Sequence, residues 1–225
     1  PAELAAGFAN LFLTTTGNGT CPPKTDTIRI NYQNFTGTVT PTATNVSCFG
    51  GSNGVATVSI TGGPTPYTYL WNTAPTQTTA TAANLPIGTY SVTITDGIGC
   101  TYPTTVNITQ PPILALTTTV TNVSCFGTST GSISSTPTGG TPPYTYTWSP
   151  GGVNTPTVGN LPIGNYSLTV TDSKGCVISA TNTITQPPVL AMTLTQTNVA
   201  CANGATGAAS SSVTGGTTPY SYSWS

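Results

Sequence analysis

Charged side chains are almost absent from this sequence, which has three Lys or Arg and four Asp or Glu among 225 residues and no histidine. The charged residues are Glu3, Lys24, Asp26, Arg29, Asp96, Asp172 and Lys174. Such a chain lacks the basic surface that nucleic acid requires. No stretch approaches the ~18 apolar residues of a membrane helix. We therefore expect no nucleic-acid partner and no membrane insertion.

The same scarcity argues against an enzyme. A nucleophile needs a His, Lys or carboxylate base beside it, and glycoside hydrolysis needs paired carboxylates. Calcium needs several oxygen ligands, whereas Asp96 and Asp172 each stand alone. The six cysteines have no histidine partners and form no CxxC pair, so zinc is not expected. We predict no catalytic residue, no metal and no cofactor, and we expect oxidised cysteines in an exported protein.

What the sequence does contain is a repeat of about 76 residues, read directly from its own letters. The segment 44–50 returns at 121–127 and, degraded, at 197–201. Trp71, Trp148 and Trp224 are 77 and 76 residues apart. The predicted units are the C-terminal half of a preceding repeat (1–35), two complete repeats (36–112 and 113–188) and the N-terminal part of a further repeat (189–225). We expect a fragment of a longer array that forms an end-to-end rod.

Within each repeat, apolar and polar residues alternate with the period of a half-buried strand, as in Tyr144-Thr145-Tyr146-Thr147-Trp148. No window shows helical spacing. The fold class predicted is therefore all-β, with tandem immunoglobulin-like β-sandwiches of six or seven short strands. The expected core residues are Trp71, Trp148 and Trp224, together with Tyr90 and Tyr166, the latter at the position of a tyrosine corner.

The six cysteines, Cys21, Cys48, Cys100, Cys125, Cys176 and Cys201, leave two disulfide patterns open. In an immunoglobulin-like strand order, Cys48 and Cys100 lie at opposite ends of one domain, separated by roughly 26 Å for an eight-residue strand. Bridged Cα atoms must lie within about 7 Å, which favours an interdomain Cys48–Cys176 bond. Small secreted domains usually bridge internally, which favours Cys48–Cys100 and Cys125–Cys176 instead.

The motifs SCFGxxxG, TGGxxPYxYxW, LPIGxYSxTxTD and ITQPP together resemble the repeats of SprB-type gliding-motility adhesins of Bacteroidota. The resemblance covers nearly the whole chain, except that residues 22–35 depart from the pattern. It implies an immunoglobulin- or PKD-like sandwich, type IX secretion and an extracellular filament at the cell surface. The partners it implies are the motility or anchoring machinery and external surfaces or polysaccharide. A further expected partner is another copy of the same array, through lateral self-association.

The leading functional hypothesis is a structural or adhesive repeat region in gliding motility or surface attachment. The alternative is a non-catalytic spacer array carrying an unseen enzyme or carbohydrate-binding module. Tyr67, Tyr69 and Trp71 could form a sugar platform, but their recurrence in every repeat favours a role in the core. Thr27 lies in a tripeptide similar to the Asp-Ser/Thr-aliphatic O-glycosylation motif of that phylum, which makes it a candidate glycosylation site.

Overall fold

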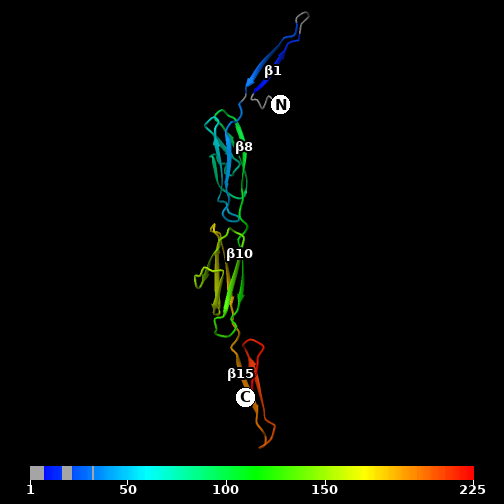
Figure 1. The fold of residues 1–225 in the computed structure, drawn as a ribbon, viewed down its shortest axis with the longest axis vertical. Helices are drawn as coiled ribbons and strands as arrows, with labels where there is room; N and C mark the ends of the chain where they lie inside the picture. Colours follow the sequence, from blue (N-terminus) through cyan, green and yellow to red (C-terminus); the bar gives the residue numbers. More distant parts are fainter. Residues whose placement is uncertain (1–7, 17–21, 32) are drawn as a thin grey trace. The chain divides into compact units, whose positions relative to one another are not determined.

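The computed structural model describes residues 8–16, 22–31 and 33–225. Over this part of the chain it contains β-strands and no helix, so the described residues include no helix that is long and apolar enough to cross a membrane. The predicted all-β class is confirmed (Figure 1). Contacts divide the chain into two compact units, one comprising residues up to 46 and 50–110, the other 47–49 and 111–225.

The first unit contains a sandwich of two three-stranded antiparallel sheets. One sheet has the order β3-β4-β6, with β3 at Thr38–Thr44, β4 at Gly54–Thr61 and β6 at Thr81–Leu85. The other has the order β5-β7-β8, with β5 at Thr68–Trp71, β7 at Gly88–Thr95 and β8 at Thr101–Ile108.

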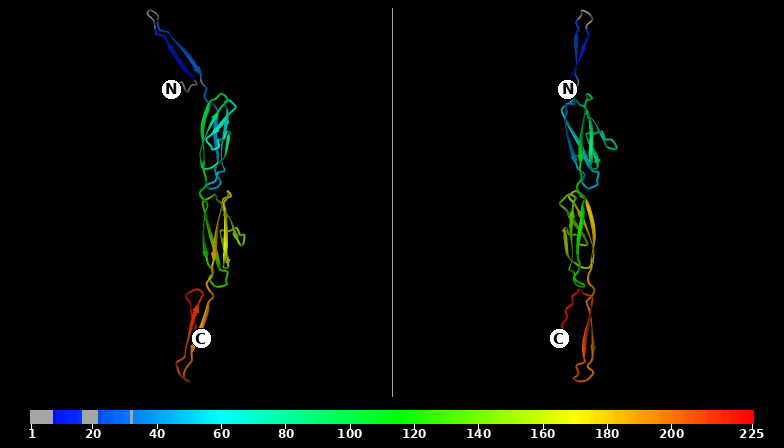
Figure 2. Two further views of the ribbon diagram at one scale, coloured as in Figure 1. Left: turned by 180° about the vertical axis from the view of Figure 1, so that it is seen from behind. Right: turned by 90° about the vertical axis from the view of Figure 1, so that its right-hand side faces the viewer.

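The second unit contains a sandwich of the same topology (Figure 2). One sheet has the order β12-β10-β9, with β9 at Ala115–Thr121, β10 at Gly131–Thr138 and β12 at Thr157–Leu161. The other has the order β11-β13-β14, with β11 at Thr145–Ser149, β13 at Gly164–Thr171 and β14 at Val177–Ile184. The split of sequential strands between two sheets is the immunoglobulin-like arrangement, so the predicted tandem sandwiches are confirmed.

Each unit also carries one antiparallel hairpin outside its sandwich. In the first unit this hairpin joins β1 (Phe8–Thr14) to β2 (Thr25–Asn31). In the second it joins β15 (Ala191–Thr197) to β16 (Ala208–Thr214). The repeat boundaries at residues 35, 112 and 188 stay predictions.

The core of each sandwich comes from the inward half of the alternating residues. Its fully buried side chains include Val58, Trp71, Val92, Ile94 and Ile108 in the first sandwich and Ile133, Trp148, Leu168, Val170 and Ile184 in the second. The indole N–H groups of the two tryptophans donate to backbone oxygens, from Trp71 to Thr79 at 2.8 Å and from Trp148 to Thr155 at 2.9 Å. The indoles are thus buried with their polar atom satisfied.

Trp224, the third tryptophan predicted for a core, has a side chain that is 60% exposed, and its place in a core stays a prediction. Trp148 is covered because its strand pairs with β13, placing Trp148 opposite Leu168. Residues 189–225 supply the hairpin β15–β16 but no counterpart of β13 or β14, so nothing there encloses the third indole.

Two tyrosines occupy equivalent places near the starts of β7 and β13. Tyr90 is half-buried and donates its hydroxyl hydrogen to the Pro86 carbonyl at 3.0 Å. Tyr166 is buried and donates to the Pro162 carbonyl at 3.1 Å. A hydroxyl bonded to backbone a few residues upstream is the geometry of a tyrosine corner. This explains why Tyr follows the Leu-Pro-Ile-Gly motif by two positions.

Candidate functional site: the loops that carry the cysteines

The loop between β3 and β4 carries Cys48 and is fastened to the end of β8 by two side chains. Asn45 Oδ1 accepts the Thr109 N–H at 2.9 Å, and Gln110 Oε1 accepts the Gly50 N–H at 2.8 Å. Gly50 takes a φ of 73°, the left-handed region that favours glycine. Cys48 is therefore held at a fixed place, half-buried, beside the last strand of its repeat.

The equivalent loop of the second sandwich repeats this arrangement. Asn122 Oδ1 accepts the Thr185 N–H at 3.0 Å, and Gln186 Oε1 accepts the Gly127 N–H at 2.9 Å. The Thr-Asn and Thr-Gln-Pro-Pro motifs, far apart in sequence, thus act together: their hydrogen bonds hold the cysteine loop against the end of the last strand. The cysteine carried by this loop is Cys125, which is exposed.

Asp172 organises the hairpin that carries Cys176. Its Oδ1 accepts the N–H groups of Lys174 and Cys176 at 2.8 and 2.9 Å, and its Oδ2 accepts that of Thr141 at 2.8 Å. A Cβ on Gly140 would lie 2.7 Å from Asp172 Oδ2, which explains the glycine at that position. Burial by itself would raise the pKa of Asp172, but the surrounding backbone N–H donors outweigh it and hold the pKa below its ordinary value.

The same turn in the first sandwich is missing one donor. Asp96 Oδ1 accepts the N–H groups of Ile98 and Cys100, at 3.1 and 2.8 Å. Asp96 Oδ2, however, is buried without a hydrogen-bond partner. The position of Thr141 is taken here by Pro64, which has no N–H to donate. A single substitution in the Gly-Gly-x-x-Pro-Tyr motif thus leaves one buried carboxylate oxygen unsatisfied.

We expect Asp172→Asn to remove part of the acid sensitivity of the second sandwich. A group whose folded pKa is lowered stabilises the fold above its unfolded pKa of about 3.9, and this stabilisation is lost as pH falls through the folded value. Melting temperatures measured between pH 7 and pH 2 should therefore fall less steeply below about pH 4 in the variant. Asp26→Asn, at an exposed position of β2, is the matched control and should leave this slope unchanged.

The loop that carries Cys48 and the hairpin that carries Cys176 are joined by a disulfide between these two cysteines, with a Cα–Cα distance of 5.7 Å. The bond spans 128 residues of sequence and lies in the second compact unit, to which residues 47–49 belong by their contacts. Of the two predicted patterns the structure has the interdomain one. The intradomain bonds Cys48–Cys100 and Cys125–Cys176 are wrong, because Cys48 and Cys100 belong to loops at opposite ends of one sandwich.

Half of the predicted disulfide cysteines are unbonded. Cys100, Cys125 and Cys201 are free thiols, and Cys21 lies outside the described residues. Cys100 is half-buried, and its Sγ donates to the Gln33 carbonyl at 3.1 Å. Cys125 and Cys201 are both exposed. The prediction that all of these cysteines form disulfides is therefore not met by Cys100, Cys125 and Cys201.

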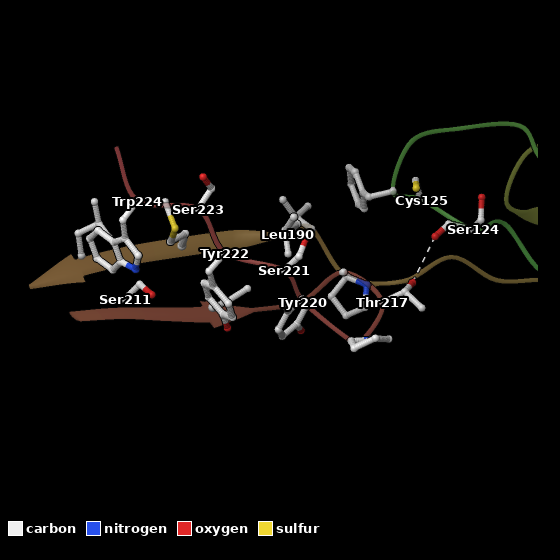
Figure 3. A pocket seen from close by; sticks show the side chains of 18 residues that line it. Ser124, Cys125, Leu190, Ser211, Thr217, Tyr220, Ser221, Tyr222, Ser223 and Trp224 are labelled. Atoms are coloured by element: carbon white, nitrogen blue, oxygen red, sulfur yellow. Dashed lines mark hydrogen bonds between the residues drawn. The ribbon is translucent and has the colours of Figure 1, made fainter. Parts of the chain in front are cut away.

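A groove of about 910 Å³ lies over the hairpin β15–β16 in the second unit (Figure 3). Its walls include Met192, Leu194, Tyr222 and Trp224, and Cys125 lies at one end. Thr217 Oγ1 donates to the Ser124 carbonyl at 3.3 Å at that end. The lining is mostly apolar and contains no acidic or basic side chain, so it offers a surface for contact and no acid–base chemistry.

The remaining predicted residues take structural or exposed positions. Tyr67 and Tyr69 pack half-buried against the core that encloses Trp71, so together they present no open aromatic platform. Thr27 is exposed on β2, and its glycosylation stays a prediction. Among the described residues, no three His, Cys, Asp or Glu side chains come together in a group that could hold a metal. Sequence reasoning missed Asn84 and Asn160, which take positive φ of 57° and 56° just before the Leu-Pro-Ile-Gly motif.

Comparison with known families gives one match, repeated three times. The model of the SprB repeat matches residues 40–76, 117–153 and 193–225. The starts of the matches lie 77 and 76 residues apart, and each match covers the cysteine loop and the strands around it. No curated protein matches the chain. SprB repeats occur in surface proteins, and a disulfide suits an extracellular protein. The three matches support a SprB-type repeat protein, and SprB repeats suggest a cell-surface region of the adhesin type.

Proposed function

We propose that this chain is a force-transmitting region of a secreted surface adhesin, acting in attachment or gliding through its mechanical continuity. The observation that carries the proposal is the Cys48–Cys176 disulfide, which joins one repeat covalently to the next. A binding domain that works alone gains nothing from such a link. A tether that transmits force gains a connection that does not depend on noncovalent contacts between repeats.

The composition of the chain supports the same function. Each recurring motif serves to build a sandwich or to position a cysteine loop, and the buried polar groups are hydrogen-bonded with few exceptions. The surface is rich in Thr and Ser and nearly free of charge. Contacts made by such a surface depend little on ionic strength, because few exposed charges are present to be screened.

The proposal is tested by immunogold labelling of intact, unpermeabilised cells of the source organism with an antibody against residues 113–188. We expect label along extracellular filaments and a loss of attachment or movement when the antibody is present. An antibody against a cytoplasmic protein of the same cells is the control for cell damage, because it labels only cells whose envelope has been broken.

Label confined to released protein or to the cell envelope, with attachment unchanged, would contradict the adhesin. That result would favour the alternative function, a spacer array that carries an enzyme or a carbohydrate-binding module elsewhere in the same protein.

A further inference from the structure

The outer edge of β6 in the first sandwich is closed by one side chain. Strand β6 pairs only with β4, and the pairing skips from Ala82 to Leu85. In this gap the amide of Gln77 bonds to both backbone groups of Ala83. Its Oε1 accepts the Ala83 N–H at 2.9 Å, and its Nε2 donates to the Ala83 carbonyl at 3.1 Å. Because unpaired N–H and C=O groups at a strand edge invite pairing with another chain, Gln77 blocks strand addition at Ala83.

The second sandwich has the same irregular edge in β12. Its pairing with β10 skips from Val158 to Leu161, and Asn160 repeats the positive φ found at the same place in β6. Gly159 is therefore the equivalent of Ala83, and its N–H and C=O are directed to the outer edge of β12. A Cβ on Gly159 would meet nothing within 4 Å, so open space adjoins this edge.

The side chain that closes the edge in the first sandwich is replaced in the second by a valine. Val153 lies two residues before Thr155, whose carbonyl accepts the core indole N–H. Gln77 lies two residues before Thr79, whose carbonyl does the same. The two positions are thus equivalent, but a valine side chain has neither donor nor acceptor. Val153 is also 41% exposed, so it adds an apolar surface in place of the missing amide.

We propose that the outer edge of β12 binds the same edge of a second copy of this chain, through an antiparallel pair centred on Gly159. In such a pair two residues exchange both N–H···O=C bonds, which is the pattern that Gln77 makes with Ala83. Gly159 of each copy supplies one N–H and one C=O, so the edge complements itself about a two-fold axis. A glycine on this axis lets two backbones approach with no side chain between them.

The distribution of charge allows two copies to approach at this edge. Residues 36–188, all of them described, contain three charged side chains, of which Asp96 and Asp172 are buried. The third, Lys174, lies in the turn between β13 and β14, in the sheet that does not contain β12. Strand edges are commonly protected from pairing by Lys or Pro, and β12 contains neither. Two copies that meet edge to edge therefore encounter no like-charge repulsion.

The proposed contact is small. One reciprocal backbone pair buries far less than the ~1,200 Å² of a stable complex, so the association should be weak and reversible. A two-fold contact uses the same edge of both partners, so it stops at two copies. The edge of β6, closed by Gln77, should add nothing. The contact is independent of the proposed mechanical function, and its failure would leave that function untouched.

The contact is tested by sedimentation equilibrium of the full chain at rising protein concentration. In every sample Cys21, Cys100, Cys125 and Cys201 are replaced by Ser, so that no disulfide forms between copies. With the native edge, the mass should rise from that of one chain toward that of two. Val153→Gln supplies the missing amide and should hold the mass at one chain. Gln77→Val opens the edge of β6, gives each copy two open edges and should produce assemblies of more than two copies.

Val153→Leu is the matched control, because it changes the side chain without supplying an amide, and it should associate like the native edge. Hydrogen exchange locates the contact. The Gly159 amide should exchange more slowly as concentration rises, whereas in Val153→Gln it should be protected at every concentration, as the amide of Ala83 is. A native edge that stays at the mass of one chain, or a Val153→Gln chain that still associates, would overturn the contact. So would a Gly159 amide that responds neither to concentration nor to Val153→Gln.

Discussion

Pulled from its two ends, the oxidised chain should release roughly 420–460 Å less length than the same chain after reduction. The Cys48–Cys176 bond spans 128 residues, and an extended chain covers about 3.3–3.6 Å per residue. While the disulfide is intact, force passes from residue 48 directly to residue 176, and the strands between them cannot be extended. Single-molecule force spectroscopy with and without a reductant measures this difference.

Cys48→Ser should give the long, reduced-type extension without any reductant. Cys125→Ser is the matched control, because Cys125 occupies the equivalent loop of the second sandwich but is unbonded within the chain. Its extension should equal that of the unmodified protein. Equal lengths before and after reduction would show that the two cysteines are not joined.

Trp148→Ala should unfold or nearly unfold the second sandwich. The indole is 1% exposed, and its N–H donates to Thr155, so the substitution removes both core volume and a hydrogen bond. Replacing a buried Trp by Ala costs about 3–5 kcal/mol, which is a large share of the 5–15 kcal/mol that usually stabilises a domain. Amide protection in β13 and β14 should fall by roughly 100-fold to several thousand-fold in hydrogen exchange.

Trp224→Ala is the matched control, because Trp224 occupies the same place in the repeat but is 60% exposed. In reduced, dilute protein it should change stability by no more than about 0.5 kcal/mol. The strands β7 and β8 of the first sandwich provide an internal reference, since neither tryptophan lies in that core. Equal losses of protection in both variants would contradict the assignment of Trp148 to the core.

The fold class could be predicted because its two signals are local and repeated. Alternation in segments such as 144–148 and 166–170 reports a half-buried strand wherever it occurs. The 76-residue period shows that these strands belong to one unit used several times. Trp71 and Trp148 fall on the buried face at the same step of the pattern, which is why their place in the core was predictable without coordinates.

The cysteine pairing was not determined by sequence, because it depends on which ends of two sandwiches come together. The immunoglobulin-like strand order excludes a Cys48–Cys100 bond only if that order is correct. The usual preference of small secreted domains for internal disulfides favours the same bond. The unsatisfied oxygen of Asp96 could not be predicted from the sequence either. It depends on Pro64, 32 residues away in the sequence, standing where the second sandwich has a residue with an N–H donor. Burial of Trp224 would depend on strands that residues 189–225 do not contain, so its place in a core stays a prediction.

The position of the disulfide also determines which proteolytic cuts separate the chain into two pieces. Any single peptide bond cut between residues 49 and 175 leaves the two fragments joined through Cys48 and Cys176, so the chain stays in one piece. The exposed loops within that span, such as the connection from β11 to β12 at Gly151 and Gly152, are the places where cleavage of a folded sandwich is easiest. A surface protein built this way survives a nick at its most vulnerable loops, and a second cut outside the span is needed to shed what lies beyond it.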